Sequence, residues 1–178
     1  MTPDAAPSPQ DPTRFRAVMG RWATGVSVIT AHDSSGDAGL TVNALLSVSL
    51  APPSLLVSLS NDADTLPVVD RSGHFGASFL AAGQRSVSER FALTLPAVEK
   101  FARLALHRGP HGSPLLDGAL GAVECRVVSR APTFDHVLLV GEVIYAESGP
   151  DGPPLLFFRS GYAEGDGPDR LRLPPRHP

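Results

Sequence analysis

The chain is patterned mainly as short runs of apolar and β-branched residues, each bounded by glycine, proline or polar turn residues. Runs of this kind predict strands, and they span residues 26–30, 39–43, 54–60, 74–80, 121–130, 136–146 and 155–159. Six or seven strands with few helices between them favour an antiparallel, closed or nearly closed barrel over a doubly wound parallel sheet. There is no G-x-G-x-x-G motif and no Walker loop, so a nucleotide must be held by other means.

A few segments have helical periodicity instead. In residues 14–22 the side chains of Phe15, Val18, Met19 and Trp22 share one face, with Thr13 as the expected cap, and we expect this apolar face to lie on the sheet. Residues 65–70 and 84–92 predict two further helices, and residues 99–104 a helical turn. The stretch 107–112, rich in glycine, proline and histidine, is expected to be a long functional loop.

Composition narrows the class of protein. A length of 178 residues suits one domain, assigned to residues 13–163, with a disordered arm at 1–12 and a flexible tail at 164–178. A net charge of −3 disfavours nucleic acid as a partner. The single cysteine excludes an internal disulfide, and no apolar run is long enough to span a membrane, so the expected location is the cytoplasm.

The first candidate for chemistry is the polar side of the strand at residues 41–43. Thr41 and Asn43 project from the same side and Val42 from the other, so this side of the strand is polar. Backbone amides and an Asn side chain can meet the polar atoms of a planar heterocycle at the mouth of a barrel. The alternative is an edge strand with solvated polar residues. His107 and His111 are four residues apart, but Gly109 and Pro110 intervene, so no metal site is predicted.

Five blocks of sequence resemble the flavin reductase-like, FMN-binding split-barrel family, whose small members are reductase components of two-component monooxygenases. The blocks are residues 15–30 (FRAVMGRWATGVSVIT), 47–53 (SVSLAPP), 112–118 (GSPLLDG), 135–143 (DHVLLVGEV) and 154–159 (PLLFFR). The resemblance covers roughly residues 14–162 in the family's order.

This resemblance implies a mainly β, antiparallel split barrel with a few short flanking helices that forms a homodimer. It implies an NAD(P)H:flavin oxidoreductase that uses FMN or FAD with NADH or NADPH and supplies reduced flavin to a partner flavin-dependent monooxygenase. The implied contacts are Thr41, Val42, Asn43, Ala44, Leu45 and Ser47 at the flavin ring; Leu59, Ser60, Asn61 and Thr65 near the ribityl phosphate; Phe91, Lys100 and Phe101 enclosing the flavin across the dimer; and His136, the candidate catalytic residue, with Phe158, Arg159 and Tyr162 at the nicotinamide.

The chain departs from the common family pattern at several of these places. Ala44 stands where relatives commonly have serine, and Leu46 where they have threonine or another small residue. Asp62 and Asp64 add negative charge near the expected phosphate. Phe134 replaces the usual glycine, and its ring could fill nicotinamide space. Two alternatives therefore stay open. The barrel acts directly on an organic substrate, or it is a binding protein without redox chemistry.

Overall fold

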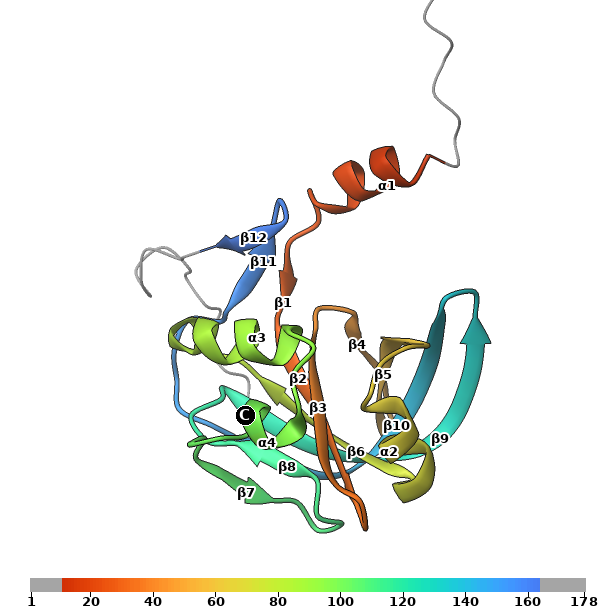
Figure 1. Ribbon diagram of the computed structural model, residues 1–178, viewed down its shortest axis with the longest axis vertical. Coiled ribbons are helices and arrows are strands. Elements are labelled where there is room, and N and C mark those ends of the chain that lie inside the picture. Colours follow the sequence, from red (N-terminus) through yellow and green to blue (C-terminus); the bar gives the residue numbers. More distant parts are fainter. Residues whose placement is uncertain (1–10, 164–178) are drawn as a thin grey trace, which may run out of the picture.

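The computed structural model describes residues 11–163, and its main element is a seven-stranded sheet with the strand order β3-β2-β6-β9-β10-β5-β4 (Figure 1). The strands are β2 (Ser27–Asp33), β3 (Gly36–Val42), β4 (Leu45–Leu50), β5 (Pro53–Ser60), β6 (His74–Phe79), β9 (Gly121–Thr133) and β10 (His136–Ser148). Every neighbouring pair is antiparallel. The two edge strands, β3 and β4, are joined only by Asn43 and Ala44, so the sheet must curl until its edges approach there. The split barrel expected from the sequence is confirmed.

Two small sheets flank this barrel. One contains β1 (Thr24–Gly25), β11 (Leu156–Phe158) and β12 (Gly161–Ala163), and the other pairs β7 (Leu106–Arg108) with β8 (Pro114–Leu116). The expected long loop at 107–112 is therefore wrong in its extent, because β7 takes its first residues. The turn that remains is held in place by hydrogen bonds to a side chain of β9. The fully buried carboxylate of Glu124 accepts backbone N–H groups of His111 (2.8 Å) and Ser113 (2.9 Å).

The core lies inside the curled sheet and follows the period of two that a half-buried strand requires. In β5 the side chains of Leu55, Val57 and Leu59 are buried, whereas their neighbours are partly exposed. Phe75 of β6 is fully buried at the centre, and a Cβ atom on Gly141 would lie 2.7 Å from its ring. Gly141 is therefore fixed by close packing.

Short helices close the remaining openings. They are α2 (Leu66–Ser72), the 3-10 turn η1 (Ala82–Gln84), α3 (Arg85–Ala92) and α4 (Ala97–Lys100). Pro67 stands in the first turn of α2, as predicted, and Gly73 ends that helix in the left-handed conformation with φ 71°. Phe91 of α3 is 1% exposed and faces β3 at Gly39. The α3 helix thereby fixes the strand that leads to the site.

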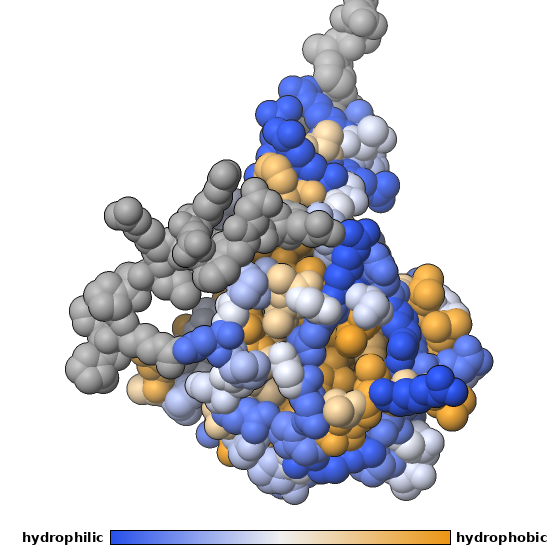
Figure 2. Space-filling view, turned by 90° about the vertical axis from the view of Figure 1, so that its left-hand side faces the viewer, coloured by the Kyte–Doolittle hydropathy of each residue, from blue (hydrophilic) through white to orange (hydrophobic). Residues whose placement is uncertain are grey.

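The first helix, α1 (Pro12–Met19), departs from expectation. Its cap is Asp11, whose carboxylate accepts the N–H of Thr13, so Thr13 is not the capping residue. The predicted apolar face does not lie on the sheet, because α1 projects away from the barrel (Figures 1 and 2). Phe15, Val18 and Trp22 are 66%, 60% and 70% exposed. The periodicity predicted the helix correctly, but no element within residues 11–163 covers its apolar face.

None of the helices within residues 11–163 has both the length and the apolar character needed to cross a membrane. The arm and tail expected at the two ends lie almost wholly outside the described residues.

Candidate functional site

Three hollows meet at Asn43, where the chain passes from β3 to β4. The main hollow has a volume of about 320 Å³ and is lined by Trp22, Asn43, Leu45, Phe79 and neighbouring residues of β1. The tyrosine hollow is lined by Val26, Thr41, Val42, Asn43, Ala92, Phe157 and Tyr162. The phenylalanine hollow is lined by Arg16, Met19, Gly20, Trp22, Asn43, Phe157, Phe158 and Ser160. Asn43 is the residue that all three share.

The position of Asn43 follows from where β3 ends. Val42 is 8% exposed and points into the core, so Thr41 and Asn43 lie on the outer side, as the alternation predicted. At Asn43 the chain bends, and Ala44 rejoins the sheet by accepting the N–H of Ser58 at 3.0 Å. The Asn43 amide is left exposed at the mouth of the barrel, where it can donate and accept hydrogen bonds.

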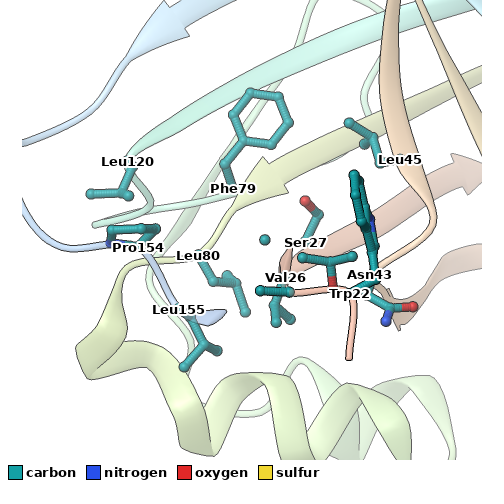
Figure 3. A pocket seen from close by; sticks show the side chains of 13 residues that line it. Trp22, Val26, Ser27, Asn43, Leu45, Phe79, Leu80, Leu120, Pro154 and Leu155 are labelled. Carbon is teal, nitrogen blue, oxygen red and sulfur yellow. The ribbon is translucent and has the colours of Figure 1, made fainter. Parts of the chain in front are cut away.

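The wall of the main hollow is largely apolar. Figure 3 shows the Trp22 ring beside Leu45 and Asn43, with Leu120, Pro154 and Leu155 on the opposite wall. Trp22 was expected to pack on the sheet, but it lines this hollow instead. An apolar wall with an amide at its edge matches the needs of a flat ring that has polar atoms on its rim. The residues present therefore fit a flavin ring.

A hydrogen-bond chain fixes the polar side of the tyrosine hollow. The Thr41 hydroxyl donates to the carbonyl oxygen of Ser88 at 2.7 Å, and the Ser88 hydroxyl shares a 2.8 Å hydrogen bond with the Tyr162 hydroxyl. Ser88 is fully buried, so this bond is shielded from water. It joins β3, α3 and β12. Sequence reasoning missed Ser88, although a serine three residues before the apolar Phe91 marks a polar group on the inner face of α3.

Phe91, Lys100 and Phe101 lie behind β3, within their own subunit. Phe91 contacts Phe101 edge to face at 5.0 Å, and the 7% exposed Lys100 donates its ammonium to the carbonyl oxygen of Gly39 at 3.0 Å. Burial lowers the pKa of Lys100, while the charge of Asp64 acts in the opposite direction. These residues support the strand that carries Thr41 and Asn43. Their predicted contact with the flavin stays a prediction.

A second cluster of predicted residues lies at the tip of the β9–β10 hairpin. His136 pairs with Ser60 across β10 and β5, and its ring contacts the Asp135 carboxylate at 2.8 Å. Asn61 donates its side-chain amide to the carbonyl oxygen of Phe134 at 3.0 Å. In Figure 1 this tip and the β11–β12 hairpin lie on opposite sides of the molecule. One chain therefore does not bring His136 to Phe158, Arg159 and Tyr162.

Phe134, whose ring could fill nicotinamide space, lies on the surface of its own subunit. Phe134 is 98% exposed and has a φ of 56°, the left-handed region that favours glycine. Glycine suits this position because the hairpin turns here. The aromatic ring is almost fully exposed to solvent and lines none of the hollows around Asn43.

The remaining predicted residues divide between edge and core. Ser47 is exposed on β4, where Leu46, Val48 and Leu50 are also 52%, 50% and 88% exposed. Leu59 and Thr65 are each 1% exposed and cannot reach a ligand without a local opening. Within residues 11–163, no group of three or more histidine, cysteine or acidic residues is placed to bind a metal ion.

Comparison with known proteins identifies the family. Residues 19–166 match the family described as flavin reductase like domain. The reductase component of 4-hydroxyphenylacetate 3-monooxygenase from Thermus thermophilus is 36% identical over 148 residues, which are 83% of this chain and 93% of that protein. The actinorhodin polyketide dimerase of Streptomyces coelicolor is 37% identical over 148 residues, which are 83% of this chain and 82% of that protein.

A solved structure has the same fold. The NADH:FAD oxidoreductase SgcE6 of Streptomyces globisporus, in complex with NAD and FAD fragments, is 32% identical, with a TM-score of 0.84 over 94% of this chain and 99% of that one. The chain therefore belongs to the flavin reductase-like family.

Proposed function

We propose that the chain is an NAD(P)H-dependent flavin reductase, which binds a flavin ring at Asn43 and supplies reduced FMN or FAD to a separate flavin-dependent monooxygenase. The observation that carries this proposal is the meeting of three hollows at one amide, between Trp22 on one side and Tyr162 on the other. The name of the Thermus relative, a reductase component, supports the same activity. The proposed compartment is the cytoplasm, which suits the unpaired, buried Cys125.

The chemistry asks little of catalytic side chains. When bound, the flavin and the nicotinamide donor would supply the two rings between which a hydride is transferred, so both reacting rings belong to the ligands. The protein has to hold two rings face to face and exclude water. The apolar wall of the main hollow and the Thr41–Ser88–Tyr162 chain provide such a surface. His136 is a candidate positioning residue for the donor rather than a proton-transfer group.

We further propose a homodimer in which the site is completed by a second copy. The hairpin tip with His136 and the β11–β12 hairpin are far apart in one chain, so only another subunit can bring the two sets of predicted residues to one ligand (Figure 1). The free edge of β4 carries the exposed side chains of Leu46, Val48 and Leu50, a surface suited to association. Replacing Leu50→Glu should shift sedimentation from dimer to monomer; a dimer that persists unchanged argues against β4 as the interface.

The activity is tested by anaerobic stopped-flow absorbance with NADH and added FMN, then FAD. Repeated bleaching of excess flavin supports a reductase that releases its product. The Asn43→Ala variant should raise the KM for flavin about fivefold, because a lost hydrogen bond costs about 1 kcal/mol. Ser34→Ala, at the exposed β2–β3 turn, is the control. Absence of bleaching with either flavin and either donor in folded protein overturns the proposal.

A second candidate is supported by the similarity to the Streptomyces coelicolor polyketide dimerase. In this reading the barrel retains its flavin and acts directly on an organic substrate. Cofactor retention distinguishes the two: a yellow protein that keeps its flavin through gel filtration favours direct action, and a colourless protein that turns over added flavin favours the reductase. A folded protein that binds no flavin would support the binding-protein reading.

A further inference from the structure

Three arginine residues surround a fourth hollow, and only Arg159 of its lining residues was among the predicted site residues. This arginine hollow has a volume of about 270 Å³ and is lined by Arg16, Ala17, Gly20, Arg21, Arg159 and Ser160. It lies between the end of α1 and the turn of the β11–β12 hairpin. The backbone N–H of Arg159 donates to the carbonyl oxygen of Gly20 at 2.7 Å and holds the two segments together.

The turn that presents Arg159 has an unusual backbone. Arg159 and Ser160 have φ angles of 50° and 60°, so two consecutive non-glycine residues occupy the left-handed region. Such a conformation is unfavourable for residues with a Cβ atom, and it persists only where the surroundings impose it. Here it directs the Arg159 guanidinium across the ring of Phe158, 5.1 Å from the ring centroid.

The part of the chain that the structure describes supplies no carboxylate to balance the charge of the arginine hollow. Within residues 11–163, no carboxylate forms an ion pair with Arg16, Arg21 or Arg159, and no acidic residue lines the hollow. Among the other described arginines, several have carboxylate partners, namely Arg71, Arg85, Arg108, Arg126 and Arg130. In a chain of net charge −3, three clustered guanidinium groups without a counter-charge form a local site for an anion.

The arginine hollow is continuous with the proposed flavin site. It shares Arg16, Gly20 and Ser160 with the phenylalanine hollow, which in turn shares Asn43 with the main and tyrosine hollows. From Asn43 outward, the surface is therefore first an amide, then the rings of Phe157 and Phe158, and then guanidinium groups. A ligand that matches this order has a polar-edged ring at one end and phosphate groups at a distance from it.

We propose that the arginine hollow binds the pyrophosphate of the nicotinamide dinucleotide donor. This inference rests on the proposed reductase function and adds a site to it. Guanidinium groups bind phosphate oxygens in pairs, and three of them suit the two linked phosphates of a dinucleotide. All three arginines thereby become determinants of donor affinity through their contacts with the pyrophosphate.

Binding can be measured without turnover, because Trp22 is the only tryptophan of the chain and lines the adjoining hollows. We would titrate the full chain with ADP-ribose, which keeps the pyrophosphate but lacks the nicotinamide, and follow Trp22 fluorescence, with calorimetry as a second readout. The variants Arg16→Gln, Arg21→Gln and Arg159→Gln should each weaken binding about threefold to tenfold. Arg14→Gln, on the same helix but outside the hollow, should leave it unchanged.

The dependence of ADP-ribose affinity on ionic strength provides a second test of the proposal. Raising the ionic strength from about 0.01 M to 0.15 M shortens the Debye length from about 30 Å to about 8 Å, so ADP-ribose affinity of the native protein should fall. The Arg21→Gln/Arg159→Gln double variant should lose much of this dependence. Adenosine, which has no phosphate, should bind all variants equally.

Two results would overturn the inference. The first is an ADP-ribose affinity that does not change with the arginine substitutions. The second is a loss of affinity for FMN but not for ADP-ribose, which would assign the hollow to the flavin phosphate. Turnover tests the proposed function separately. If the native protein fails to oxidise NADH with any flavin but binds ADP-ribose through the arginines, only the reductase function fails. If it turns over and the substitutions change nothing, only the pyrophosphate site fails.

Discussion

Ser88 and Tyr162 share a 2.8 Å hydrogen bond between their hydroxyl groups, and this bond connects α3 to β12 beneath the tyrosine hollow. Because Ser88 is fully buried, a hydroxyl left without its partner there loses hydrogen bonding that water cannot replace. The bond therefore couples the shape of the site to the packing of α3.

We expect Tyr162→Phe and Ser88→Ala each to lower the free energy of unfolding by about 1 kcal/mol. The double variant should cost little more than either single change, because both remove the same bond. Urea unfolding of the four proteins measures this coupling. Fully additive losses would show that the two hydroxyls are stabilised independently.

Gly39 should not tolerate a side chain. A Cβ atom there would lie 2.7 Å from the Phe91 ring and 3.2 Å from the carbonyl oxygen of Ile29. Gly39→Ala should therefore destabilise the protein by about 1–3 kcal/mol. Gly83→Ala, where a Cβ atom meets nothing within 4 Å, is the matched control. Equal stability of both variants would mean that Phe91 moves freely.

Phe134 is expected to be less stable than glycine in its turn. Its φ of 56° is unfavourable for a residue with a Cβ atom, and its ring is 98% exposed and gains little from packing. Phe134→Gly should raise the free energy of unfolding by about 0.5–1 kcal/mol. The substitution removes the backbone strain at this φ, and the flexibility of glycine in the unfolded chain offsets part of that gain. Thermal unfolding at low protein concentration measures it. A loss of stability instead would show that the ring contacts another subunit.

The pH dependence of stability should include a contribution from His107. The Asp117 carboxylate, 2.8 Å away, raises the pKa of His107, and the nearby Glu147 acts in the same direction. A raised pKa in the folded state means that charged His107 stabilises the protein fully below its unfolded value of about 6.5. This stabilisation is lost as the pH rises through the folded pKa. Asp117→Asn should flatten the fall in stability above pH ~6.5, as followed by urea midpoints, whereas an unchanged profile would exclude the pair.

Local pattern was enough to predict most strands and the α2 and α3 helices, because alternation and β-branched runs report burial directly. It also placed Val42 inside and Asn43 outside. The α1 helix shows the limit of such reasoning. Its apolar face is plain in the sequence, but periodicity cannot state what covers a face, and no part of its own barrel does.

The site was predicted less completely, since it is formed by segments distant in the chain. Thr41, Asn43 and Tyr162 were expected to act with His136, but the hairpin places His136 on the other side of the molecule. The arginine hollow depends on a backbone contact between Gly20 and Arg159, residues that no local pattern links. The composition states how many arginines the chain has, but not which of them lie together in the fold.

The pairing of β1 with β11 has a consequence for synthesis on the ribosome. Thr24 emerges early, but its partner Phe157 is among the last described residues to be made. A nascent chain that ends after β10 has every strand of the main sheet yet lacks the wall formed by Phe157, Phe158 and Tyr162. The wall of the site is thus completed only after the segment that carries β11 and β12 has been made.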